Sequence, residues 1–183
     1  MAEGIDFSLM TLNLITQEDY VLCKNFKSTN PSMDNFLKND AYFSTITKEA
    51  ATSLVLYKEQ LVGYFTLQRH KTRTFEEINQ NNFLYIERIA VEQNYQRKGI
   101  GDYILNNILK ISRMVNERII FLDALIEKVE WYEKRHFNRV IENESKLSNK
   151  DGLVLMFADL SDKELEKQYL GLSDDDELDD YQS

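Results

Sequence analysis

The stretch QRKGIG at residues 96–101 decides the fold of this chain. It lies between an apolar run at residues 86–91, which predicts a strand, and a run at residues 102–114 with the spacing of a helix. The first turn of a helix has backbone N–H groups without an intrahelical partner, and the helix dipole adds partial positive charge there. Glycine lets the backbone approach a ligand closely, and Arg97 and Lys98 add full charges. The sequence therefore predicts a site for the diphosphate of a phosphorylated cofactor.

We compare this stretch with three known phosphate-binding sequence patterns. A Walker loop requires Gly-x-x-x-x-Gly-Lys-Ser/Thr, but Asp102 and Tyr103 follow Gly101. A dinucleotide fingerprint requires a third glycine where this chain has Ile104. The third pattern, Gln-x-x-Gly-x-Gly after a strand at residues 87–91, resembles the acetyl-CoA loop of the GNAT acyltransferase superfamily.

Length and composition indicate one globular domain. The chain has 183 residues, of which 43% are hydrophobic and 29% charged. We expect a single domain over residues 1–170. No apolar run approaches the roughly 18 residues of a membrane span, and the N-terminus does not resemble a secretory signal. Cys23 is the one cysteine and there are two histidines, so we expect no disulfide, no metal site and a reducing, cytoplasmic setting.

The net charge of −9 is unevenly distributed along the chain. Residues 161–183 contain nine acidic and two basic residues, which leaves 22 acidic and 20 basic residues in the other 160. Residues 171–183 cannot bury enough apolar surface to become ordered, so a flexible acidic tail is expected there. The nearly neutral remainder argues against nucleic acid as a partner.

The predicted elements follow one another in the order of a GNAT domain. We expect an α/β fold of mixed type, with a central, mostly antiparallel, splayed sheet flanked by helices. The resemblance covers about residues 7–160. Strands are predicted at residues 7–15, 53–57, 61–68, 83–91, 118–125, 137–142 and 153–160, and helices from residue 16 and at 32–46, 99–114, 128–135 and 161–169.

The resemblance to GNAT acetyltransferases implies acetyl-CoA as the cofactor. The strand before the loop and the following strand would splay apart, and the pantetheine arm would pair with the exposed strand edge. Ile89 and Val91 would supply backbone contacts to that arm. The expected cofactor-binding residues are Ile89, Ala90, Val91, Gln96, Arg97, Lys98, Gly99, Ile100 and Gly101.

A second GNAT landmark lies at residues 131–137. The sequence WYEKRHF resembles the family segment Phe/Leu-Tyr-Glu-Lys-x-Gly-Phe, except that His136 replaces the glycine. By resemblance, Tyr132 is the general acid that protonates the departing thiolate; the alternative is a core tyrosine on a short helix. Because the replaced glycine often has a left-handed backbone conformation, His136 is expected to adopt it.

A third similarity is to the subgroup that contains toxins that acetylate aminoacyl-tRNA. It rests on residues 26–37, on GYFTL at 63–67, on ERIAV at 87–91 and on the pair at 123–124. Ser28-Thr29 stand where the subgroup has Cys-Gly. Holding tRNA requires a basic surface, which the charge count does not favour beyond a local patch such as Arg69, Lys71 and Arg73.

The general base is harder to assign from the sequence. Glu87 shares a face with Ile89 and Val91 if the strand alternates regularly, and it could act as a base through water or form a salt bridge. The leading hypothesis is an acetyl-CoA-dependent N-acetyltransferase of a primary amine on a small molecule, peptide or protein. The alternatives are the tRNA-directed toxin and a non-catalytic acyl-CoA-binding module. A homodimer stays open.

Overall fold

The computed structural model describes residues 4–71, 82–140 and 152–161. Within them one sheet has the strand order β1-β2-β3-β4-β5-β7-β6. All neighbouring strands are antiparallel except β4 and β5, which are parallel. This arrangement confirms the expected mixed α/β fold with a mostly antiparallel sheet. The strands are β1 Met10–Leu14, β2 Ala51–Tyr57, β3 Gln60–Lys71, β4 Asn82–Val91, β5 Ile119–Leu125, β6 Asn138–Arg139 and β7 Leu153–Asp159.

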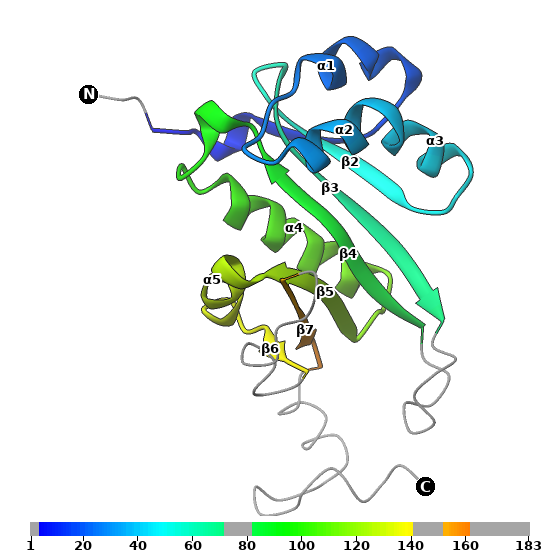
Figure 1. Cartoon of the computed structure of the whole chain (residues 1–183), viewed down its shortest axis with the longest axis vertical. Helices are drawn as coiled ribbons and strands as arrows, with labels where there is room; N and C mark the ends of the chain where they lie inside the picture. Colours follow the sequence, from blue (N-terminus) through cyan, green and yellow to red (C-terminus); the bar gives the residue numbers. More distant parts are fainter. Residues whose placement is uncertain (1–3, 72–81, 141–151, 162–183) are drawn as a thin grey trace, which may run out of the picture.

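Helices cover both faces of the sheet, as Figure 1 shows. The helices are α1 Tyr20–Asn25, α2 Pro31–Asn39, α3 Ala41–Ile46, α4 Ile100–Met114 and α5 Val129–Glu133. One core lies between α4 and the sheet, and a second lies between the first three helices and β2–β4. Tyr64 belongs to the second core and Phe65 to the first, because successive side chains of a strand point to opposite faces. No helix in these described ranges is long and apolar enough to cross a membrane.

Several predicted boundaries differ from the structure for identifiable reasons. The helix expected at 32–46 is two helices, because Asp40 ends α2 and begins α3. The strand expected at 7–15 begins at Met10, after a 3-10 turn. The strand expected at 137–142 is described only at Asn138–Arg139. The helix expected from Ser161 and the acidic tail lie outside the described residues.

Local sequence signals explain the remaining elements of the first half. Pro31 is the first residue of α2, and the side chain of Asn30 accepts a hydrogen bond from the Ser32 N–H at 3.0 Å. Lys58 and Glu59 both have positive φ values, 48° and 66°, at the turn between β2 and β3. A two-residue turn of this kind matches the twist of the paired strands.

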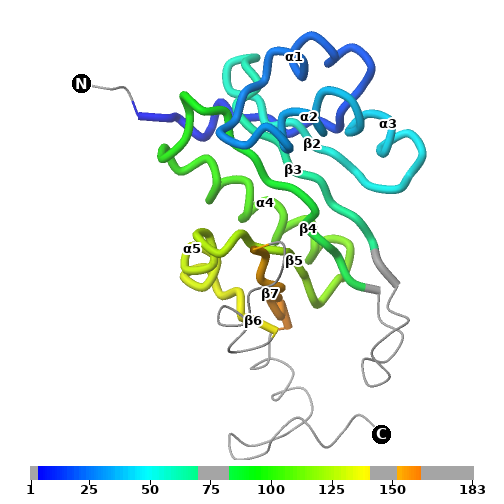
Figure 2. The backbone as a smooth tube through the Cα atoms, viewed as in Figure 1, coloured from blue at the N-terminus to red at the C-terminus, as the bar shows by residue number. Residues whose placement is uncertain are grey.

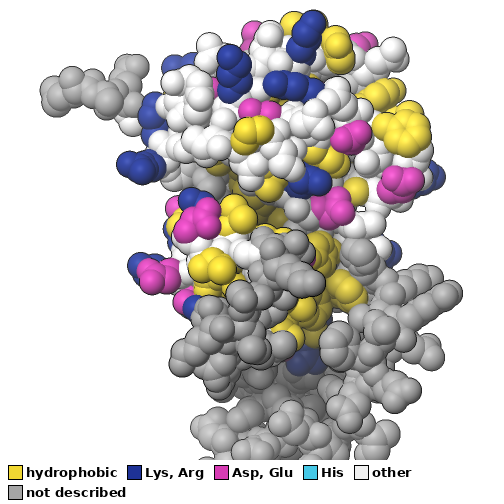
Figure 3. All heavy atoms as spheres, viewed as in Figure 1, with side chains coloured by type: hydrophobic (Ala, Val, Ile, Leu, Met, Phe, Trp, Pro, Cys, Tyr) yellow, Lys and Arg dark blue, Asp and Glu magenta, His cyan; other side chains and the backbone are white. Residues whose placement is uncertain are grey.

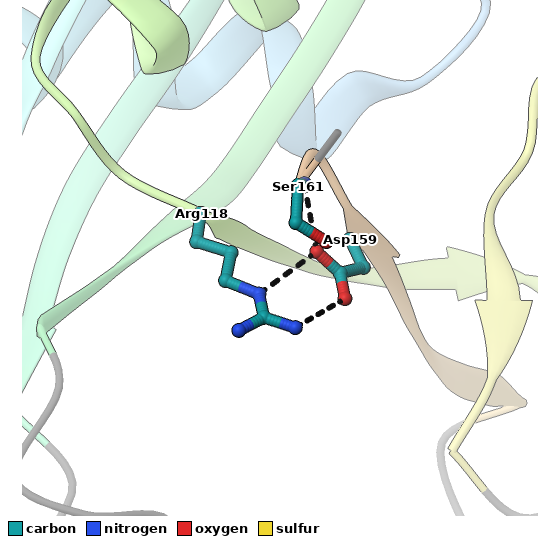
Figure 4. A network of polar contacts seen from close by, with 3 residues as sticks. All are labelled: Arg118, Asp159 and Ser161. Carbon is teal, nitrogen blue, oxygen red and sulfur yellow. Dashed lines mark hydrogen bonds and ion pairs between the residues drawn. The ribbon is translucent and has the colours of Figure 1, made fainter. Parts of the chain in front are cut away.

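An ion pair ties the start of β5 to the end of β7. The guanidinium of Arg118 donates two hydrogen bonds of 3.1 Å to the carboxylate of Asp159, which also accepts one from the Ser161 N–H (Figure 4). Partial burial favours the protonated carboxyl, but these hydrogen bonds outweigh it and lower the pKa of Asp159 to about 2. The charged form of Asp159 is therefore stabilised by folding.

We predict that Asp159→Asn lowers the free energy of unfolding in a pH-dependent way. The folded pKa lies below the unfolded value of about 3.9, so the contribution is complete above that pH and is lost as pH falls toward 2. Because Arg118 is 46% exposed, we expect a loss of no more than about 1 kcal/mol at pH 7. Urea unfolding at pH 7, 4 and 3, with Glu130→Gln as an exposed control, measures it. A difference that stays constant across this range would contradict the prediction.

Candidate functional site

The site is built where β4 separates from β5. These strands pair only between Leu84–Ile86 and Ile120–Leu122, whereas β4 stays paired with β3 as far as Val91 and β5 stays paired with β7 as far as Leu125. From Glu87 onward, β4 therefore has a strand partner on one side only. Backbone groups on its other side face the gap between the two strands, which is the splay that the sequence predicts. A strand edge of this kind can accept an extended ligand.

A β-bulge in β4 marks the start of the splay. Thr66 pairs with Arg88 and Leu67 pairs with Ile86, so Glu87 has no partner on β3. The extra residue interrupts the strict alternation of side chains. Ile86 and Ile89 consequently lie on the same face, against the core beneath α4. The prediction that Glu87 shares this face with Ile89 and Val91 is wrong, because the regular alternation of side chains does not continue through the bulge.

The exposed Glu87 lies instead near a hydrogen-bonded pair on the opposite face. The hydroxyl of Tyr85, on β4, donates a short hydrogen bond to the carboxylate of Asp123, on β5. Burial raises the pKa of Tyr85, and the hydrogen bond to Asp123 and the negative charges of Asp123 and Glu87 raise it further. Two carboxylates therefore flank the splay on the face away from α4. Sequence reasoning left Asp123 without a role, because the resemblance predicts that these two strands splay apart but no motif indicates that Tyr85 and Asp123 meet.

The loop before α4 contains two residues with a left-handed backbone and leads into the free N–H groups of the helix. Arg97 and Gly99 both have positive φ values, 60° and 83°. The first intrahelical hydrogen bond runs from the Tyr103 N–H to the Gly99 carbonyl at 3.0 Å. The N–H groups of residues 100–102 precede it and have no intrahelical partner. The exposed side chains of Arg97 and Lys98 add charge beside these donors.

Gln96, Gly99 and Ile100 also have structural tasks. Nε2 of Gln96 donates to the Val91 carbonyl at 3.2 Å, which ties the loop to the end of β4. A Cβ on Gly99 would lie 3.0 Å from the ring of Phe7, and Figure 2 shows the N-terminal segment beside the start of α4. The side chain of Ile100 is buried in the core, so only its backbone is available to a ligand.

Helix α5 packs against the N-terminal turn of α4. A Cβ on Gly101 would be 3.3 Å from the ring of Trp131, so glycine permits this close approach. Arg135 stacks on Trp131 at 3.9 Å and forms an ion pair with Asp102. An exposed ion pair contributes at most about 1 kcal/mol, whereas a buried side chain such as Phe137 contributes roughly 1.5–3 kcal/mol. Apolar packing therefore holds α5 in place, and the ion pair orients it.

Tyr132 follows Trp131 and is held between two aromatic rings. Its ring lies 4.8 Å from that of Trp131 and 5.7 Å from that of Phe137, centroid to centroid. Burial raises the pKa of Tyr132 to about 12. The hydroxyl makes no hydrogen bond within the part of the chain that the structure describes. The phenol is a weaker acid than its ordinary value implies and stays protonated throughout the physiological range.

The turn after α5 confirms the expected consequence of the missing glycine. His136 has a φ of 66°, a left-handed conformation that glycine adopts without strain. The N–H of Phe137 donates to the Tyr132 carbonyl at 3.2 Å, which closes the turn. The substitution therefore leaves Tyr132 in position at a cost of about 1 kcal/mol in backbone strain.

The other predicted cofactor-binding residues lie on the splayed part of β4, but their side chains differ in burial and in the face they occupy. Ile89 and Val91 are half-buried on the splayed part of β4, while the side chain of Ala90 is buried against the other face. Cys23 is buried in the core beneath α1, as expected for a small apolar residue. Residues 72–81, which follow β3 in the chain, lie outside the described residues.

Comparison with known proteins identifies the family. A family model described as the acetyltransferase (GNAT) family matches residues 16–137. The chain belongs to this family. Membership confirms the predicted fold, the activity class of acetyl transfer and acetyl-CoA as the acetyl donor. No curated protein sequence matches the chain significantly.

Solved structures of toxin acetyltransferases have the same fold. A tyrosine-to-phenylalanine mutant of the toxin AtaT, bound to acetyl-CoA and to the C-terminus of the antitoxin AtaR, aligns with a TM-score of 0.65 at 20% identity, over 88% of this chain and 98% of that chain. A tyrosine-to-phenylalanine mutant of KacT aligns with a TM-score of 0.67 at 17% identity, over 87% and 99%. AtaT complexed with acetyl-methionyl-tRNAfMet aligns with a TM-score of 0.64 at 20% identity, over 87% and 99%.

Proposed function

We propose that this protein is an acetyl-CoA-dependent N-acetyltransferase that transfers the acetyl group to a primary amine of a small molecule, peptide or protein. The observation that carries the proposal is the splay of β4 from β5, which opens beside both the N-terminus of α4 and the helix that bears Tyr132. A binding site for the diphosphate, an open strand edge and a proton donor thus lie in one region. Acetyl transfer from a thioester requires these three features.

The residues around the splay fit the parts of the cofactor. The diphosphate would accept hydrogen bonds from the N–H groups of residues 100–102, beside Arg97 and Lys98. The pantetheine arm would lie along β4 at Ile89 and Val91 as an added strand does. Bound there, the cofactor supplies the reactive thioester. A backbone N–H of the splayed segment would polarise the thioester carbonyl.

The chemistry then needs two proton transfers. With acetyl-CoA bound, the acceptor amine would form a bond to the thioester carbon, and the bond from that carbon to sulfur would break. Tyr132 donates its proton to the departing sulfur; its high pKa keeps the phenol protonated until a thiolate forms. Glu87 accepts the proton of the attacking amine through water, aided by the charge of Asp123 on the same face.

The aminoacyl-tRNA acetyltransferase is the second candidate. The structural likeness to AtaT and KacT favours it. The distribution of charge opposes it, because Figure 3 shows acidic and basic side chains interspersed over the described face rather than gathered in a basic patch. Arg69, expected in a local basic patch, is paired with the buried carboxylate of Glu117. We therefore rank the small-molecule, peptide or protein amine first. We also propose a cytoplasmic location, because a single cysteine fits a reducing compartment.

We predict that acetyl-CoA raises the melting temperature and that Arg97→Gly reduces this rise. Ligand that binds only the folded state stabilises it by mass action. Glycine suits the positive φ at position 97, so the variant loses a charge without backbone strain, and affinity should fall roughly tenfold. Lys110→Ala, on the exposed surface of α4, is the matched control and should behave as wild type. Absence of any shift with millimolar acetyl-CoA in the wild type would refute cofactor binding at this loop.

We also predict that Tyr132→Phe lowers kcat about 10²-fold, as expected for loss of a general acid. The stabilisation by acetyl-CoA should change little, because the hydroxyl forms no hydrogen bond within the described part of the chain. Steady-state kinetics beside thermal shifts measures both, and Tyr57→Phe on β2 serves as the control for a tyrosine away from the site. Wild-type turnover by Tyr132→Phe would assign Tyr132 to the core.

A further inference from the structure

Arg88 is a half-buried cation that forms no ion pair with any residue that the structure describes. Its Nε atom is inaccessible to solvent and has no hydrogen-bond partner in the described ranges. Its guanidinium lies over the ring of Phe36 at 4.2 Å, and Nη1 reaches only the weak acceptor Sδ of Met33 at 3.9 Å. None of the ion pairs among the described residues includes Arg88. A buried guanidinium without an anion costs stability.

The nearby acid, Asp34, forms no ion pair with Arg88. Asp34 lies close enough to influence Tyr64, as Arg88 does, but its carboxylate accepts hydrogen bonds from the N–H and hydroxyl of Ser28 at 2.8 and 2.7 Å. The Tyr64 hydroxyl donates a hydrogen bond to the Met33 carbonyl at 2.8 Å, and among the described residues it forms no hydrogen bond with Arg88. The described neighbours on α2 thus contact the face of the guanidinium and its Nη1 atom without forming an ion pair with it.

The position of Arg88 identifies that partner. Arg88 comes directly after the bulge, at the start of the splay, and its side chain lies on the face covered by α2. Helix α4 and its core fill the other face. An amine that attacks a thioester held along β4 must therefore approach from the side of Arg88, where Tyr85, Glu87 and Asp123 also lie.

We propose that Arg88 binds a carboxylate of the acceptor, so that the substrate is a small molecule of the amino-acid type with an amine and a carboxylate. This inference rests on the proposed acetyl transfer. A planar guanidinium matches a carboxylate with two parallel hydrogen bonds, and its burial beneath α2 suits a compact anion better than the backbone of a polymer. The carboxylates of Glu87 and Asp123 then receive the amine end. The opposite charges on this face would orient the acceptor.

The first test compares matched acceptors in the wild type. Free L-amino acids, their carboxamides and their methyl esters are offered with labelled acetyl-CoA. At least one free amino acid should have a kcat/KM roughly 10- to 100-fold above that of its neutral derivatives, as expected for a charged hydrogen bond. Equal or faster turnover of the neutral derivatives, or no turnover of any amino acid while acetyl-CoA binds, would overturn the proposal. Preferential labelling of aminoacyl-tRNA would also overturn it, because the aminoacyl carbonyl is an ester.

The second test uses variants of Arg88. Arg88→Gln should raise KM for the carboxylate acceptor and remove the advantage of that acceptor over the carboxamide, with a smaller effect on kcat. Arg88→Lys should retain part of this advantage. Arg113→Gln, exposed on α4, is the control. Arg88→Met should melt no lower than wild type, because it removes an unpaired buried charge; marked destabilisation with an unchanged acceptor preference would indicate a structural role.

Separate results would refute acetyl transfer and the role of Arg88. If acetyl-CoA does not raise the melting temperature of the wild type, the proposed acetyl transfer would be refuted. If acetyl-CoA raises the melting temperature of Arg88→Gln normally, and the wild-type enzyme prefers neutral amines over carboxylate acceptors, only the role of Arg88 would be refuted.

Discussion

The separation of β4 from β5 is the constraint on which the rest of the site depends. Both strands are fully paired on their outer sides, to β3 and to β7, but they share only three residue pairs with each other. The bulge at Glu87 begins this separation. It bends β4 and exposes a strand edge next to the turn that begins α4. A regular strand would have continued the parallel ladder and closed the gap.

Apolar packing positions the chemical groups around this gap. Gly101 allows Trp131 to lie against the first turn of α4, so the helix that carries Tyr132 is fixed relative to the N–H groups expected to hold the diphosphate. The same turn thus combines two features, since the N–H groups of residues 100–102 have no intrahelical partner while the side chain of Ile100 packs in the core. Arg88, which has no ion pair among the described residues, lies on the face of β4 covered by α2. The cofactor would therefore be bound from the α4 side of β4, and the acceptor would be oriented from the α2 side.

Much of the fold could be predicted from the sequence, because its signals are local. The glycine-bearing turn before α4, the proline at the start of α2 and the short hairpin between β2 and β3 each determine their own geometry. The left-handed conformation at His136 followed from one missing glycine. The bulge at Glu87 has no such signal, since it depends on how β3 and β4 pair. For the same reason the Tyr85–Asp123 hydrogen bond and the isolation of Arg88 could not be foreseen.

Backbone amide hydrogen exchange along β4 tests the central claim most directly. Exchange is compared residue by residue with and without acetyl-CoA. We predict that the cofactor slows exchange at amides of the splayed segment 87–91 that face β5 and at residues 100–102, because both groups gain hydrogen-bond partners, while β1 and β2 are unaffected. Unchanged exchange in segment 87–91 despite saturating acetyl-CoA would contradict the account, since the strand edge would then not be the binding surface.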